Sequence, residues 1–205
     1  AAIRHKNRAV TISDYEALAY EATSNICKAK CYSNKNEQGE KAYGHITLVI
    51  LQKDYENARK YFASVREQIM NYMKTRMSSH LINQNLFHIV EPDFIEFSVI
   101  AEVEVTEYDQ VFDVRTAIMK RLEDFLNPIR GNYNYSGWAI GEVPNTTQIL
   151  NALKEIKGIH YIENVRLIAY RKGKNGKFEV DVDKISENPY ALSLNGTHDI
   201  MIKVK

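Results

Sequence analysis

The residues of this chain that could do chemistry are thinly spread, and only one stretch gathers several of them. Residues 127–142 hold three of the nine glycines, two of the thirteen tyrosines and the only tryptophan, together with Arg130. Aromatic rings beside a guanidinium can stack on the bases of single-stranded nucleic acid. The same residue types also anchor protein–protein interfaces. The stretch offers no catalytic nucleophile, no general base and no set of metal ligands.

Six residues of this stretch form the candidate site, either as an interface or as a structural motif. They are Arg130, Tyr133, Tyr135, Gly137, Trp138 and Gly141. Glycines lose much backbone freedom on folding, so a glycine-rich segment indicates a shaped connection, a close backbone approach or a contact surface. Trp138 either fills the local core or anchors a neighbouring subunit.

Two pairs of carboxylates have a spacing that deserves consideration. Glu102 and Glu104 share one face of a predicted strand, roughly 6.6 Å apart at the usual rise per residue, which is a separation that two-carboxylate hydrolysis can use. Asp181 and Asp183 flank one residue and could bind calcium weakly. Alternating charges are also typical of the solvent-facing side of a strand, and we adopt that interpretation for both pairs.

Cysteines and histidines form no metal motif in the sequence. Cys27 and Cys31 point to the same side of a predicted strand, roughly 13 Å apart, too far for a disulfide. The six histidines show no helical pairing with another ligand. They are His5, His45, His80, His88, His160 and His198. Neither a phosphate-binding glycine loop nor a nucleophile elbow is present. We therefore expect no metal, no cofactor and no enzymatic activity.

Composition excludes some classes of partner. The 205 residues include 44% hydrophobic and 26% charged residues, which is ordinary for a globular protein. With 27 basic and 26 acidic residues the net charge is +1, so we expect neither nucleic acid nor a membrane surface as partner. No apolar run reaches the roughly 18 residues of a membrane span. No signal peptide is visible, and a start at Ala1 rather than methionine indicates a processed or partial chain.

Hydrophobic periodicity predicts the elements that must position the candidate site. Helices are expected over residues 11–25, 58–76, 109–125 and 145–156, and strands over 26–32, 43–51, 94–107, 159–171 and 200–204, with a short extended piece over 81–90. The first helix has two possible capping pairs, Thr11 with Asp14 and Ser13 with Glu16. Residues 174–177 and 194–197 both contain Asn-Gly, which is a hairpin signal.

This order of elements predicts an α+β fold in which helices are segregated from antiparallel or mixed sheets. Pro92 marks a boundary, because proline interrupts a strand ladder. We expect an arm over residues 1–10, a small α+β unit over 11–92, and a second unit over 93–205. The second unit is predicted to be a split β-α-β arrangement, as in ferredoxin-like folds, with added C-terminal hairpins.

Two stretches of the chain resemble the baseplate J-like proteins, which are wedge subunits of contractile phage tails and related injection systems. The first stretch reads RAVTISDYEALA over residues 8–19, followed by ICKAKC over 26–31. The second comprises the strand over 94–105, FLNP over 125–128, GWAIG over 137–141 and GIHYI over 158–162. The resemblance covers roughly residues 8–170 in one order, and it implies that this chain is the C-terminal region of such a protein.

That resemblance implies a structural role. The chain would assemble with other baseplate wedge subunits, self-associate in a ring, form in the cytoplasm and then belong to a tail or injection particle. The alternative hypothesis is a small-ligand-binding regulatory module, because ferredoxin-like units often bind metabolites between paired domains. Fold analogy alone supports that alternative.

Overall fold

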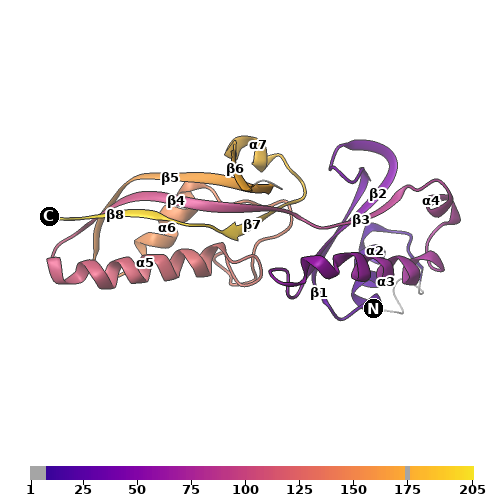
Figure 1. The fold of residues 1–205 in the computed structure, drawn as a ribbon, viewed down its shortest axis with the longest axis horizontal. Coiled ribbons are helices and arrows are strands. Elements are labelled where there is room, and N and C mark those ends of the chain that lie inside the picture. Colours follow the sequence, from indigo (N-terminus) through magenta and orange to yellow (C-terminus); the bar gives the residue numbers. More distant parts are fainter. Residues whose placement is uncertain (1–7, 174–175) are drawn as a thin grey trace. The chain divides into compact units, whose positions relative to one another are not determined.

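The computed structural model describes residues 8–173 and 176–205, and the chain divides after Pro92 into two compact units (Figure 1). Both units combine helices with a mixed β-sheet, which confirms the predicted α+β class. Residues 1–7 of the predicted arm lie outside the described residues, as do the two residues at the tip of the hairpin predicted over 174–177. No helix of the described part is long and apolar enough to cross a membrane.

The N-terminal unit is a three-stranded sheet in the order β1-β2-β3. Strands β1 and β2 pair antiparallel, whereas β2 and β3 pair parallel. Its elements in chain order are α2 (Ile12–Ala22), β1 (Ile26–Lys35), β2 (Lys41–Gln52), η1 (Ala58–Tyr61), α3 (Phe62–Lys74), α4 (Ser79–Asn83) and β3 (Phe87–Val90).

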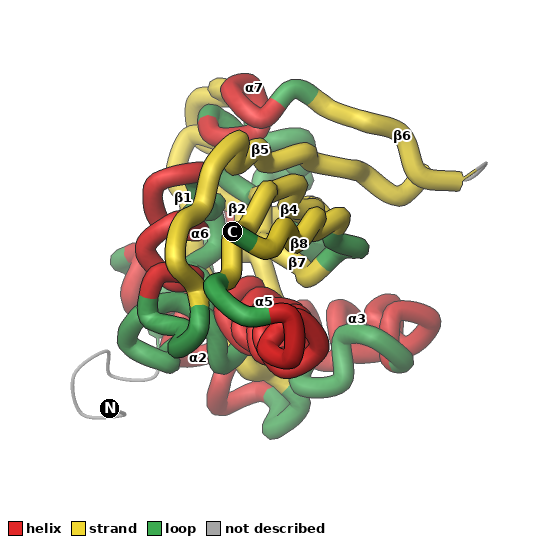
Figure 2. Tube along the Cα trace, turned by 90° about the vertical axis from the view of Figure 1, so that its left-hand side faces the viewer, coloured by secondary structure: helices red, strands yellow, loops and turns green. Residues whose placement is uncertain are grey.

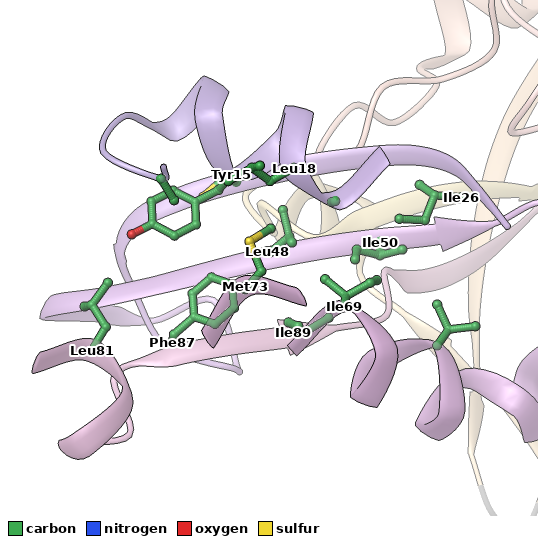
Figure 3. Packing of buried hydrophobic residues seen from close by; sticks show 14 residues of the cluster. Tyr15, Leu18, Ile26, Leu48, Ile50, Ile69, Met73, Leu81, Phe87 and Ile89 are labelled. Carbon is green, nitrogen blue, oxygen red and sulfur yellow. The ribbon is translucent and has the colours of Figure 1, made fainter. Parts of the chain in front are cut away.

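The core of this unit lies between the sheet and its helices (Figure 3). Buried side chains come from one face of α2, from one face of α3 and from alternate positions of β2. The larger ones are Tyr15, Leu18, Leu48, Ile50, Ile69, Met73 and Phe87. The rings of Tyr15 and Phe87 stack with centroids 5.5 Å apart. The helical periodicity of residues 62–73 therefore arises from packing on one sheet face.

A capping box starts α2. The Asp14 amide donates to Thr11 Oγ1 at 3.3 Å, and the Thr11 amide donates to Asp14 Oδ2 at 2.7 Å. Of the two pairs considered from sequence, the first is the one that forms. We expect Thr11→Ala to lower the free energy of unfolding by about 1 kcal/mol, because it removes the side-chain acceptor of the capping box. Urea denaturation measures this loss. Ser13→Ala, within the helix, is the control, and an equal loss in both variants would contradict the assignment.

Two predicted boundaries in this unit are wrong. The helix expected over 58–76 begins with the 3₁₀ turn η1 and becomes α-helical only at Phe62, where Tyr61 makes no side-chain cap. Leu81, expected in an extended piece, lies buried in the five-residue helix α4. A helix of so few residues completes barely one turn, so its hydrophobic period cannot be distinguished from that of a strand.

The C-terminal unit is a five-stranded sheet in the order β6-β5-β4-β7, with β8 also paired to β4. Its elements in chain order are β4 (Asp93–Val105), η2 (Tyr108–Gln110), α5 (Val111–Leu126), α6 (Thr146–Lys154), β5 (Ile159–Gly173), β6 (Gly176–Val180), α7 (Val182–Ser186), β7 (Ala191–Asn195) and β8 (Asp199–Val204). Helix α5 lies along one face of β4, β7 and β8 in both views (Figures 1 and 2).

The core of this unit forms where α5 and α6 cover the sheet. Alternate residues of β4 are buried, as the sequence predicted. They are Ile95, Phe97, Val99, Ala101, Val103 and Val105. They share the core with one face of α5, formed by Val114, Ile118, Leu122 and Phe125. The start of α6 is capped by Asn145, whose Oδ1 accepts from the Gln148 amide at 2.9 Å.

The topology of this unit differs from the predicted split β-α-β arrangement. Strands β4 and β5 are direct neighbours and run antiparallel, whereas a split unit places parallel strands on either side of a third. Two helices, α5 and α6, separate these strands, so the chain returns to the sheet in the opposite direction (Figure 1).

Only one of the two predicted C-terminal hairpins is formed within the described residues. Strands β5 and β6 pair antiparallel as expected. The hairpin predicted over 194–197 is wrong, because β7 and β8 both pair parallel with successive parts of β4. Gly196 serves close packing here: a Cβ on it would lie 2.7 Å from Ser98 Oγ and 2.8 Å from Phe97 O.

Candidate functional site

The segment 127–142 starts at the C-terminal end of α5. Asn127 leaves the helix with φ −63° and ψ 127°, and Pro128 follows. Asn127 Oδ1 accepts from the amides of Ile129 and Arg130, both at 2.9 Å. This Asx turn redirects the chain immediately after the helix, as asparagine side chains do at turns.

Trp138 lies in the core and contacts the C-terminal end of α5. Its side chain is fully buried and meets the Phe125 ring edge-on, with centroids 5.5 Å apart. Its indole Nε1 donates to Phe125 O at 2.8 Å, and the Asn132 amide donates to the same oxygen at 2.9 Å. The last carbonyls of a helix lack partners within the helix, so these donors satisfy one of them. Trp138 therefore fills the core of its own unit.

Two candidate glycines allow the loop to fold back. Gly137 has φ +77°, and a Cβ on it would lie 2.2 Å from Pro128 O. Gly141 has φ +88°, and its amide donates to Ala191 O at 2.7 Å, which ties the loop to β7. Gly131, not among the predicted site residues, is equally constrained, since a Cβ there would lie 2.2 Å from Phe125 O. Its role depends on a carbonyl six residues earlier, which spacing alone did not reveal.

The other three candidates lie on the outside of the same loop. Tyr133 is 42% exposed, rests edge-on against Phe125 at 5.1 Å and donates its hydroxyl to Gln148 O at 2.7 Å. Desolvation raises the pKa of Tyr133. Tyr135 is 69% exposed and has φ +56°. Arg130 is also exposed.

The loop thus divides the candidate residues into an inner and an outer set. Gly137, Trp138 and Gly141 build its hydrogen-bonded interior. Arg130 and the two tyrosines, which we call the outer set, face solvent on that scaffold. A non-glycine residue at positive φ, such as Tyr135, persists only where its surroundings determine it. Chemically, this surface offers one guanidinium and two phenols for contact.

Glu102, Glu104 and Asp181 of the two carboxylate pairs make structural contacts. Glu102 binds Lys203, and it accepts from Asn164 Nδ2 at 3.0 Å. The Lys203 hydrogen bond is the main reason why the pKa of Glu102 is lowered. Glu104 lies 3.8 Å from His160 Nε2. Asp181 Oδ1 accepts from the Asp183 amide at 3.0 Å and so caps α7.

Metal ligands do not gather within the described residues, where no group of three or more histidine, cysteine, aspartate or glutamate side chains could hold an ion. Both cysteines are reduced. Cys31 is buried, and this burial raises the pKa of its thiol to about 12, which makes it a poor nucleophile at neutral pH.

The N-terminal unit contains a row of three polar side chains in contact, His45, His88 and Glu37, that was not predicted from the sequence. His45 Nδ1 lies 2.8 Å from His88 Nε2, and His88 Nδ1 lies 3.2 Å from Glu37 Oε1. The three residues come from β2, β3 and the turn between β1 and β2, up to 51 positions apart. Strand pairing brings the two histidines together and the turn adds Glu37, so local spacing held no signal for them.

Comparison with known proteins finds a solved structure with a similar fold. No protein-family model matches the sequence, and no curated protein matches it. Among solved structures, the chain is similar to one in the cryo-EM structure of the anti-feeding prophage baseplate, with six-fold symmetry applied. The TM-score is 0.54 at 13% sequence identity, and the match covers 97% of this chain. The chain spans 39% of the length of that baseplate chain. It therefore shares a fold with part of a baseplate protein.

Proposed function

We propose that this chain is a structural part of the baseplate of a contractile tail or injection particle, where it joins neighbouring subunits through protein–protein contacts. The observation that carries the proposal is the fold likeness to a prophage baseplate chain over 97% of this chain, which takes in both units. The sequence resemblance to the baseplate J-like wedge proteins over residues 8–170 supports the same class independently.

The partners proposed are other wedge subunits and further copies of this chain in a ring, with no nucleic acid and no membrane. A six-fold ring needs surfaces that meet different surfaces on the next copy, because only such heterologous contacts close into a ring. The proposal assigns the chain no catalytic activity and no cofactor. Assembly in the cytoplasm would precede its place in the particle.

The outer set is the surface that we propose for such a contact. Tyrosine and arginine are enriched among residues that dominate interface energies. The loop that carries them is already ordered by hydrogen bonds: besides its core contacts, the Ala139 amide donates to Glu142 Oε2 at 3.2 Å. Little conformational entropy would then be lost on binding, which favours affinity.

Electron microscopy of particles from a strain that lacks the gene tests whether the chain is a structural part of the baseplate. We expect tubes and sheaths without a complete baseplate, together with loss of injection or infection. Complementation with the intact gene should restore the complete baseplate and the injection or infection. Complete, functional baseplates in its absence would contradict the proposal.

Single substitutions test the proposed contact surface. We expect Tyr135→Ala and Arg130→Ala each to reduce incorporation into baseplates at least tenfold, because truncating an interface anchor costs about 1–2 kcal/mol or more. Their thermal unfolding should match the wild type, since both side chains are exposed. Tyr43→Ala, which removes a tyrosine 76% exposed on the other unit, is the matched control. Normal incorporation of the two loop variants would contradict the proposed contact surface. It would not contradict the proposed role in the baseplate, which the gene deletion tests.

A further inference from the structure

The edge of the C-terminal sheet contains a break that a histidine fills. Strand β7 pairs with β4 as far as Phe97 opposite Asn195, and β8 resumes with Ile100 opposite Asp199. The three residues 196–198 thus lie opposite two residues of β4, which is a bulge in a parallel edge. Such an extra residue leaves part of the backbone ladder without its usual partner.

His198 supplies the missing partner. The Val99 amide donates to His198 Nδ1 at 3.0 Å, in place of a strand carbonyl. The other ring nitrogen, Nε2, lies 2.8 Å from Asn195 Oδ1. Because an amide can only donate, Nδ1 must be unprotonated. A neutral ring then carries its proton on Nε2, which donates to Asn195. This geometry accepts one tautomer of the neutral imidazole and excludes the imidazolium ion.

Solvent can reach this imidazole. His198 is half-buried and lines an open hollow of about 280 Å³ on the sheet face away from α5. The ionisable groups that line the same hollow are Glu96 from β4, Tyr170 from β5, Lys177 from β6 and Asp199 from β8. Glu96 is paired with Lys177. Desolvation lowers the pKa of His198 to about 4, so the nearby carboxylates do not outweigh the cost of burying its charge.

We propose that His198 is a proton-sensitive latch, which holds β8 on β4 while the ring is neutral and releases this C-terminal edge when Nδ1 takes up a proton. Protonation replaces the acceptor of the Val99 amide with a second donor, so the two N–H groups face each other. The strand that follows His198 is short and lies at the edge of the sheet, where local opening costs least. This latch is independent of the proposed baseplate role.

The direction of the pH effect follows from the two protonation states. The pKa of His198 is lowered from 6.5 to about 4 in the closed edge, so an opened edge binds the proton more readily. The latch is complete above about pH 6.5 and weakens as the pH falls towards 4. By linkage, opening should become about 20-fold more favourable between pH 7 and pH 5.

Hydrogen exchange followed by NMR tests the latch. We expect the protection factors of the Val99 and β8 amides to fall about 20-fold from pH 7 to pH 5, while amides between β5 and β6 keep theirs. His198→Asn is the matched variant, because Asn Oδ1 can accept the same bond and cannot be protonated. Its protection should be independent of pH. An equal fall in wild type and His198→Asn, or no fall in wild type, would overturn the proposal.

A second variant and a direct observation complete the test. His198→Phe keeps a planar ring without an acceptor, so β8 should be poorly protected at both pH values. If that variant does not fold, the comparison of wild type with His198→Asn still decides. The ring ¹⁵N shifts of His198 should show an unprotonated Nδ1 at pH 7, and a protonated Nδ1 there would contradict the geometry.

Discussion

Trp138→Ala is expected to destabilise the C-terminal unit by about 3–5 kcal/mol, which is the usual cost of truncating a fully buried aromatic side chain. The Trp138 side chain has no solvent exposure and packs edge-on against Phe125. Its removal also takes away one of the two donors to Phe125 O. Urea denaturation followed by circular dichroism measures the loss, because the variant lacks the only tryptophan as a fluorescent probe.

Two variants separate the contributions to this effect. Trp138→Phe keeps a ring in the cavity and removes the indole N–H, so it should cost less than Trp138→Ala. Tyr135→Ala removes an exposed ring from the same loop and should change the free energy of unfolding by about 0.5 kcal/mol or less. A loss below about 1 kcal/mol for Trp138→Ala would show that the side chain is not part of the core.

Gly137→Ala is expected to have the second large effect, at least ~3 kcal/mol or a failure to fold. Two costs combine at this position. An alanine at φ +77° is strained, which costs about 1–2 kcal/mol. Its Cβ would also stand 2.2 Å from Pro128 O and 2.6 Å from Ile129 C, where backbone atoms cannot give way without unfolding the turn.

Gly44→Ala is the matched control for Gly137→Ala. Gly44 has nearly the same φ, +79°, and its nearest atom would be Leu86 Cδ1 at 4.0 Å, an ordinary contact. This variant should therefore show the conformational strain alone, measured as the shift of its own unit's unfolding transition. Equal losses in the two variants would mean that the clash with Pro128 is relieved at no cost.

Much of the fold could be predicted because local patterns and packing agree there. The alternation of apolar residues from Ile95 to Val105 matches the buried face of β4, since a strand with one covered side places apolar residues at every second position. The capping pair at Thr11 forms, because it needs only residues three positions apart. The Asn-Gly pair over 195–196 failed as a hairpin signal. Its glycine is required by the close approach of Ser98, almost a hundred residues earlier.

The candidate site shows the same division. The glycines and aromatic residues of segment 127–142 could be recognised from composition as a shaped loop. Their division into a buried and an exposed set could not, because it depends on where Phe125 O and Pro128 O lie. Gly131 was not among the predicted residues for that reason. The acceptor role of His198 could not be predicted either, since it exists only opposite the Val99 amide.

By itself, the amino-acid sequence determined the α+β class, the main helices and strands and the unusual loop after α5. Only the tertiary structure decided that Trp138 fills the core, that β4 and β5 run antiparallel and that β7 and β8 share one partner strand. The physical reason is the range of the interactions. Capping and periodicity act within a few residues, whereas burial and strand pairing depend on groups up to a hundred residues apart.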